Sequence, residues 1–267
     1  MTGRTHLVGA TMLLLAVTSL LACGEGGDTK SPMAVGGNQT SRLSGPLTVF
    51  AAASLTEALN DLKAQLAAEH PDLNLTYVFA GSQTLVTQLE QGGPGDVFAS
   101  ADDKNMQRAA GAGLVEQART FARNKLEIAV APGNPKNVRG LEDLARPDLV
   151  VVLEDPSVPA GDYTRQALSR AGVTVKAKSL ELDVKAALAK VTSGEADAAV
   201  VYVTDVKAAG RKVTGVPIPD DQNVVASYPI AVTRASGTRD AARAFVDEVV
   251  TGKGQQVLMN HGFLPAA

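Results

Sequence analysis

After about residue 46, two patterns of apolar positions alternate along most of the chain. Short apolar runs predict buried strands, and apolar positions spaced three or four residues apart predict helices. We expect strands at residues 47–50, 75–79, 97–100, 125–131, 149–153, 173–175, 198–202 and 228–232. We expect helices that include residues 55–66, 85–89, 106–110, 141–144, 163–169, 184–191 and 240–250. This alternation of strands and helices predicts an α/β fold.

The strand and helix runs fall into two groups, one before and one after about residue 125. We therefore predict two lobes, the first formed by residues 46–124 plus 232–267 and the second by residues 125–231. The strands around residues 127–130 and 230–232 are the candidates for the two crossings. This is a hinge architecture, in which a ligand binds in the cleft between the lobes.

The N-terminal region predicts export and a lipid anchor. Residues 7–22 contain no charge and no proline, and this apolar run is shorter than the roughly 20 residues that span a bilayer. We predict a signal peptide over residues 1–22, cleaved before Cys23, the only cysteine of the 267 residues. A small residue directly before a cysteine is typical of lipoproteins, so we expect Cys23 to be acylated. An ordinary cleavage site beside a free or buried cysteine is the alternative.

Residues 23–45 are rich in Gly, Ser and Thr, which predicts a flexible linker. The chain has a formal net charge of −3, no tryptophan and no Lys/Arg cluster mixed with aromatic residues, so nucleic-acid binding is excluded. No basic amphipathic helix is evident, and the lipid is therefore the one membrane contact that we predict. Together these features place the chain outside the cytoplasmic membrane, attached to its outer face.

Four predicted helix starts carry small or capping residues. They lie at residues 52–57, 80–84, 157–162 and 182–185. A routine N-cap explains any one of them, and the Ser54-x-x-Glu57 spacing predicts a capping box. As a set they predict an anion site, because helix N-termini present free N–H groups and a partial positive charge.

Five short segments occur in an order that resembles a known family. They are residues 50–55 (FAAASL), 80–85 (AGSQTL), 96–102 (DVFASAD), 158–161 (VPAG) and 201–205 (VYVTD). In this order they resemble the molybdate-binding proteins of ABC importers, from about residue 46 to residue 263. The resemblance implies a two-lobed periplasmic-binding-protein-like fold of type II, each lobe a mixed sheet flanked by helices.

The resemblance also implies a function. The protein would act as a monomer without a cofactor, capture molybdate and also tungstate, and deliver the anion to the permease and ATPase subunits of an ABC transporter. The oxyanion would be held by two serines, two further backbone amides and one tyrosine hydroxyl. Carried over motif by motif, these are Ser54, Ser82, Ala160, Val184 and Tyr202.

The sites differ in how distinctive their motifs are. Val184 rests on residues 182–188, the least distinctive motif, and Tyr202 read alone is equally a half-buried strand tyrosine. Gly81 and Gln83 flank Ser82 where some relatives have more serines. A lining of donors alone favours a fully deprotonated anion, because a protonated phosphate would bring an O–H that needs an acceptor. Sulfate is also unprotonated, so its exclusion depends on the size of the cavity.

Other functions remain open at this point. A serine hydrolase would have to use His70 or His261, and the chain has no Gly-x-Ser-x-Gly segment. Asp96, Asp102 and Asp103 could form a cation site, but their spacing fits a strand end and a helix cap better. A related binding protein for sulfate or phosphate, and a structural or adhesive lipoprotein, are the further alternatives.

Overall fold

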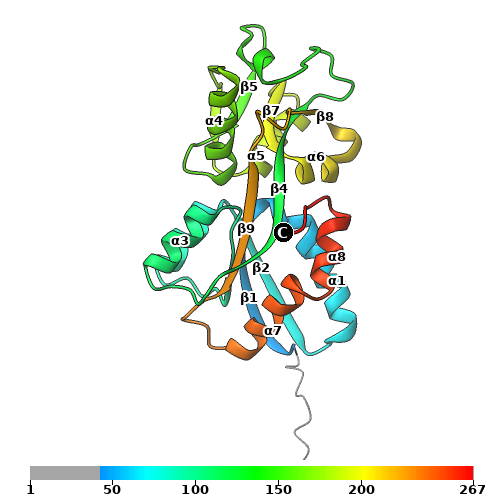
Figure 1. Ribbon diagram of the computed structural model, residues 1–267. Coiled ribbons are helices and arrows are strands. Elements are labelled where there is room, and N and C mark those ends of the chain that lie inside the picture. Colours follow the sequence, from blue (N-terminus) through cyan, green and yellow to red (C-terminus); the bar gives the residue numbers. More distant parts are fainter. Residues whose placement is uncertain (1–42, 267) are drawn as a thin grey trace, which may run out of the picture. The chain divides into compact units, whose positions relative to one another are not determined.

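The structure is a computed structural model, and it describes residues 43–266 (Figure 1). The predicted signal peptide, Cys23 and residues 24–42 of the predicted linker lie outside the described residues. Within residues 43–266, no helix combines the length and the apolar character that a membrane crossing requires.

Nine strands and eight α-helices make up the described part of the chain. The strands are β1 (Gly45–Ala52), β2 (Leu73–Ala80), β3 (Val97–Ala99), β4 (Arg119–Val130), β5 (Val151–Glu154), β6 (Ser179–Glu181), β7 (Ala198–Tyr202), β8 (Thr214–Pro217) and β9 (Val225–Val232). The helices are α1 (Thr56–Glu69), α2 (Ser82–Glu90), α3 (Asp103–Gly111), α4 (Pro159–Ala171), α5 (Val184–Thr192), α6 (Val203–Ala209), α7 (Arg239–Val250) and α8 (Lys253–Asn260). Three short 3₁₀ helices are η1 (Ala53–Leu55), η2 (Leu141–Ala145) and η3 (Gly210–Lys212).

The strands form one mixed sheet in the order β2-β1-β3-β9-β4-β7-β5-β6, with β8 paired to β4. Strands β1, β2 and β3 are parallel to one another, as are β5, β6 and β7. The long strand β4 connects the two sets. Its residues 119–125 pair antiparallel with β9, and its residues 126–130 pair antiparallel with β7. Strand β9 lies between β4 and β3 and pairs antiparallel with both.

The two parallel sets lie in two lobes, and β4 and β9 run from one lobe into the other (Figure 1). Helices α1, α3, α7 and α8 lie in the lobe of β1, whereas α4, α5 and α6 lie in the lobe of β5 and β7. The mixed α/β class agrees with the prediction. The predicted boundaries of the lobes, between residues 124 and 125 and between 231 and 232, stay a prediction.

Helix faces bury the apolar residues that their spacing predicted. Helix α1 buries Ala58, Leu59, Leu62 and Leu66 against the sheet. Each fully buried leucine contributes about 1.5–3 kcal/mol to stability. A second apolar cluster forms where Phe50 and Phe98 of the sheet pack against residues of α2 and α3. Packed helices on the sheet fix the loops at the strand ends, where the candidate site lies.

The structure differs from the prediction after α4. A strand was predicted at residues 173–175, and this prediction is wrong. Val173 and Val175 are half-buried and pack against the core, while Thr174 is exposed. The segment therefore has the alternation of buried and exposed side chains that the sequence pattern indicated. No neighbouring strand pairs with this segment within the described residues, and the strand β6 begins only at Ser179. Helices α6 and α8 and strand β8 were not predicted.

Candidate functional site

A small cavity lies between the ends of strands β1, β2 and β7 and the starts of helices α2, α4 and α5. It encloses about 220 Å³ of empty space, including the part open to solvent. Its lining residues are Ala52, Ala53, Ser54, Gly81, Ser82, Ala101, Val158, Pro159, Ala160, Asp183, Val184 and Tyr202. All five of the residues that the resemblance implied line this one cavity, although they are up to 148 positions apart in the sequence.

The charge of the lining is unusual for an anion site, because no lysine or arginine belongs to it. Asp183 is the one ionisable acid among the lining residues, and its carboxylate caps helix α5. One carboxylate oxygen accepts from the backbone N–H groups of Lys185 and Ala186, both at 2.9 Å. The first N–H groups of a helix have no partner within the helix. At the start of α5, the N–H of Val184 is not among those that the Asp183 carboxylate caps.

Helices α2 and α4 also begin at the cavity, and no side chain caps either start. Helix α2 begins at Ser82 and α4 begins at Pro159, a residue that has no N–H to leave unsatisfied. The N–H of Ala160 is therefore the first free amide of α4. Three helix N-termini around one cavity supply partial positive charge and N–H donors, which suits a small anion.

Gly161 brings the start of α4 close to the end of strand β5. A Cβ atom at this position would lie 2.1 Å from the carbonyl oxygen of Asp155 and 2.7 Å from that of Glu154. No side chain fits there without a shift of the backbone. Glycine therefore sets the depth at which Ala160 enters the cavity.

Tyr202 ends strand β7 and is only 1% exposed. Its hydroxyl oxygen is buried and has no hydrogen-bond partner among the described residues. Burial raises the pKa of this phenol well above its usual range, so the group stays an O–H donor. A buried hydroxyl without a partner costs about 1–3 kcal/mol, which a ligand in the cavity would recover.

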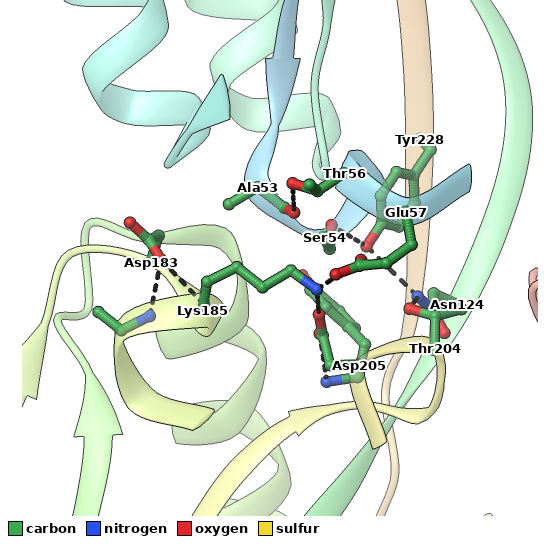
Figure 2. A network of polar contacts seen from close by, with 12 residues as sticks. Ala53, Ser54, Thr56, Glu57, Asn124, Asp183, Lys185, Thr204, Asp205 and Tyr228 are labelled. Atoms are coloured by element: carbon green, nitrogen blue, oxygen red, sulfur yellow. Dashed lines mark hydrogen bonds and ion pairs between the residues drawn. The ribbon is translucent and has the colours of Figure 1, made fainter. Parts of the chain in front are cut away.

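Ser54 does not form the predicted capping box. It lies in η1, helix α1 begins only at Thr56, and no side chain caps that helix. The Ser54 hydroxyl is instead 2.9 Å from the hydroxyl of Tyr228, and Glu57 pairs with Lys185 (Figure 2). The prediction failed because each of the two polar groups has a tertiary partner, which the sequence spacing does not reveal.

Ser82 follows strand β2, which is parallel to β1, and its hydroxyl is arranged like that of Ser54. Its hydroxyl oxygen accepts a hydrogen bond of 3.0 Å from the backbone N–H of Ala101, so its own proton is left to donate. Asp102 follows and caps helix α3 by accepting from the N–H of Asn105 at 2.9 Å. Within the described residues no group of three or more His, Cys, Asp or Glu side chains could hold a metal ion.

A polar chain that the sequence did not single out lies behind Ser54. Tyr228 on β9 contacts Ser54, and the Asn124 side chain on β4 donates to the hydroxyl of Thr204 at 2.9 Å (Figure 2). Asn124 and Tyr228 lie on the two strands that connect the lobes. Asn124 is a buried amide in a strand, but Arg123 and Lys125 flank it in the sequence, so no pattern singled it out.

An ion cluster joins three helices beside the cavity. The Lys185 ammonium lies 2.6 Å from a Glu57 oxygen and 2.9 Å from an Asp205 oxygen (Figure 2). Asp205 is fully buried, and burial raises its pKa while Lys185 opposes that shift. Burial would lower the pKa of Lys185, but Asp205 and Glu57 together raise it. The lysine is therefore charged, and its charge is balanced by the two carboxylates.

Glu154, at the end of β5, is a second buried acid that the sequence did not indicate. It is 2% exposed, and neither of its carboxyl oxygens has a hydrogen-bond partner among residues 43–266. Burial raises its pKa well above the usual range, and the nearby Asp205 and Asp183 add to the shift. The raised pKa means that burial disfavours the charged form of Glu154.

Comparisons with known proteins identify the family of the chain. A family model described as bacterial extracellular solute-binding protein matches residues 47–264. The molybdate-binding protein ModA of Mycobacterium tuberculosis is 42% identical over 260 residues, which cover 97% of this chain and 96% of that protein. The chain belongs to the molybdate-binding family of bacterial solute-binding proteins. This confirms the resemblance found in the five motifs, and this family consists of binding proteins, so the chain is not an enzyme.

Solved structures confirm the fold class. The periplasmic molybdate-binding protein of Azotobacter vinelandii superposes with a TM-score of 0.73 at 20% identity, covering 82% of this chain and 98% of that one. The sulfate-binding protein SubI of Mycobacterium tuberculosis gives a TM-score of 0.75, also at 20% identity, covering 82% and 86%. At this identity the two structures show the shared two-lobed fold alone.

Proposed function

We propose that this protein captures molybdate outside the cytoplasmic membrane and delivers it to an ABC importer. The observation that carries the proposal is the convergence of Ser54, Ser82, Ala160, Val184 and Tyr202 on one cavity. Their hydroxyls and N–H groups are all donors, and helix N-termini balance the charge of a dianion. The 42% identity to a molybdate-binding protein supports the same ligand. Tungstate has the same charge and the same lack of protons, so we include it.

Delivery follows from closure of the lobes. The anion contacts strand and helix ends from both lobes, so the closed form is favoured only when the anion is bound. The closed protein, a monomer in our proposal, then docks on a membrane permease. The chain contains no Gly-x4-Gly-Lys-Ser/Thr segment, and ATP hydrolysis therefore belongs to a separate subunit.

Calorimetric titration of the purified protein with molybdate, tungstate, sulfate and phosphate tests the ligand. We expect heat from molybdate and tungstate and none from phosphate, because phosphate carries a proton at neutral pH and the five proposed ligand groups only donate. Heat from sulfate alone, or from none of the four anions, contradicts the proposal.

Sulfate is the second candidate ligand, because it is also a dianion that carries no proton at neutral pH. Size separates the two anions, because molybdate is larger than sulfate. A sulfate affinity equal to the molybdate affinity would place the chain with the sulfate binders.

We further propose that a lipid on Cys23 holds the protein at the outer face of the membrane, with residues 24–45 as the linker. The support is the apolar run that ends directly before the only cysteine of the chain. Cys23→Ser should release the protein from the membrane fraction and leave molybdate affinity unchanged. Retention of a cleaved Cys23→Ser protein in that fraction would rule out the lipid anchor.

A further inference from the structure

The polar chain behind Ser54 can fix the direction in which that serine donates its proton. We propose that Tyr228 is a positioning residue, which, with Asn124, turns the Ser54 hydroxyl proton into the cavity. This inference rests on the proposed function, because it concerns how the same site selects an unprotonated anion. It is argued from the hydrogen-bond partners of three side chains.

The first step is the orientation of the Asn124 amide. The backbone N–H of Lys125, which can only donate, lies 3.0 Å from the Asn124 side-chain oxygen. The amide nitrogen therefore points the other way, toward the Thr204 hydroxyl at 2.9 Å and the Tyr228 hydroxyl at 3.5 Å. An amide nitrogen carries two hydrogens and accepts none, so each of these oxygens receives a hydrogen bond. Asn124 is 1% exposed, so water does not compete for these positions.

The second step is the direction of the Tyr228 proton. Tyr228 is fully buried, and burial raises the pKa of its phenol above the usual range, so the proton is retained. Its oxygen accepts from Asn124, and the Ser54 oxygen lies 2.9 Å away (Figure 2). A phenol has one proton to give. Either hydroxyl could donate in this pair; with Asn124 as a donor to Tyr228, our proposal directs the phenol proton to Ser54.

The third step is the consequence for the cavity. A serine oxygen that accepts from Tyr228 keeps its own proton for another acceptor. Ser54 lines the cavity, and the proton then points to a bound anion. Ser82 is arranged in the same way, since its oxygen accepts from the N–H of Ala101. Both serines thus act as donors, and an anion that carries an O–H finds no acceptor among them.

The test is a double-mutant cycle with molybdate affinity as the readout. Tyr228→Phe removes only the hydroxyl and should weaken binding about tenfold, close to the effect of Ser54→Ala. If Tyr228 acts through Ser54, the double variant binds no more weakly than Ser54→Ala alone. Coupled sites show this non-additivity, whereas independent sites multiply their fold-changes.

The matched control is Tyr77→Phe, which also removes one phenol oxygen. The Tyr77 hydroxyl is buried without a partner on β2, away from the cavity lining. We expect its affinity to remain within about twofold of the wild type. If Tyr228→Phe does not fold, Asn124→Ala tests the chain one step further back, with loss of affinity expected only while Ser54 is present.

Each outcome decides between the two proposals. Unchanged affinity in Tyr228→Phe, or fold-changes that multiply with those of Ser54→Ala, overturns the positioning role while molybdate binding stands. A wild-type protein that binds no molybdate overturns the proposed function, and this inference fails with it. Non-additive loss at Tyr228 with no effect at Tyr77 supports the positioning role.

Discussion

At the scale of single residues, Tyr202 is the one side chain of the cavity lining that has a buried polar atom without a partner among the described residues. Its hydroxyl is buried and unpartnered among the described residues, and burial keeps it protonated. A buried donor without an acceptor destabilises the empty protein, whereas an anion oxygen in the cavity would accept from it. This residue therefore links stability to ligand binding.

Tyr202→Phe removes that donor and leaves the ring in place. We expect molybdate affinity to fall by about 1–3 kcal/mol, because the anion loses a hydrogen bond from a desolvated donor. The ligand-free protein should be as stable as the wild type or slightly more stable, since the buried orphan is gone. Calorimetric titration and thermal unfolding of the same samples measure the two effects. Equal affinity in wild type and variant would place Tyr202 outside the site.

Glu154 gives a prediction about pH. Its pKa in the folded protein is raised well above the ordinary value of 4.5, so the folded state binds this proton more tightly than the unfolded state. The stability that comes from the proton is present below pH 4.5 and is lost as the pH rises toward the folded pKa. Burial of Glu154 therefore destabilises the protein at neutral pH.

Glu154→Gln keeps the shape and removes the ionisation. We expect the variant to unfold at a higher temperature than the wild type at pH 7, and at a similar temperature at pH 4. Each unit of pKa shift corresponds to about 1.4 kcal/mol. Thermal unfolding across pH 4–8 measures the difference. A constant difference between the two proteins over this range would mean that Glu154 does not titrate as described.

At the scale of secondary structure, the starts of three helices shape the site more than any charged side chain does. The sequence predicted helix starts within residues 157–162 and 182–185, and helices α4 and α5 begin inside these ranges, at Pro159 and Val184. How deeply each helix start enters the cavity depends on tertiary packing. Gly161 at the start of α4 is the clearest example.

Gly161→Ala tests that packing. The added methyl group would lie 2.1 Å from the Asp155 carbonyl oxygen, so α4 has to move away from β5. We expect a loss of about 1–3 kcal/mol in stability and weaker molybdate binding, because the Ala160 amide moves with the helix. Unfolding by denaturant and calorimetric titration measure the two losses.

Gly111→Ala on α3 is the matched control for the same change of residue. A Cβ atom at Gly111 meets nothing within 4 Å. Alanine favours a helix over glycine by up to about 1 kcal/mol, so this variant should be equally or more stable, with normal affinity. If both alanine variants behave alike, close packing at Gly161 does not explain its effect.

The elements that sequence patterns predicted correctly are those with apolar faces of regular period. Helix α1 belongs to this group, because Leu59 and Leu62 lie on its buried face at helical spacing. Strand β7 belongs to it too, because residues 198–202 form a continuous apolar run. The predicted strand at 173–175 failed because alternation reports exposure and not pairing. Helix α6 was missed because it begins directly after β7, with no turn residue between them. Its Asp205 is buried in an ion pair with Lys185, a tertiary contact that the sequence pattern does not show.

At the scale of the molecule, the two lobes touch through polar side chains next to the cavity. Glu57 lies on α1 in one lobe, and Lys185 lies on α5 in the other (Figure 2). The motifs predicted both helices but not this contact, because it joins residues 128 positions apart. Asp205 pairs with the same lysine within the second lobe. If the lobes open and close as we propose, Glu57 is the member of the cluster that separates on opening.

Glu57→Gln should weaken molybdate binding without unfolding the protein. The Glu57 side chain is 42% exposed, so solvent limits its pair with Lys185 to about 0.2–1 kcal/mol, or up to about fivefold in affinity. Because only the closed form contains the pair, the loss appears in binding and not in thermal stability. Salt screens exposed pairs, and the difference from wild type should shrink between 0.05 and about 0.5 M salt.

Glu90→Gln is the control for this last prediction. Glu90 pairs with Arg108 between α2 and α3 of one lobe, a contact that closure does not make or break. Its removal should leave molybdate affinity unchanged at every salt concentration. Titrations of the three proteins at low and high salt therefore separate an ion pair that favours closure from a general effect of surface charge. A loss at Glu57 that high salt leaves intact would point to packing as its cause.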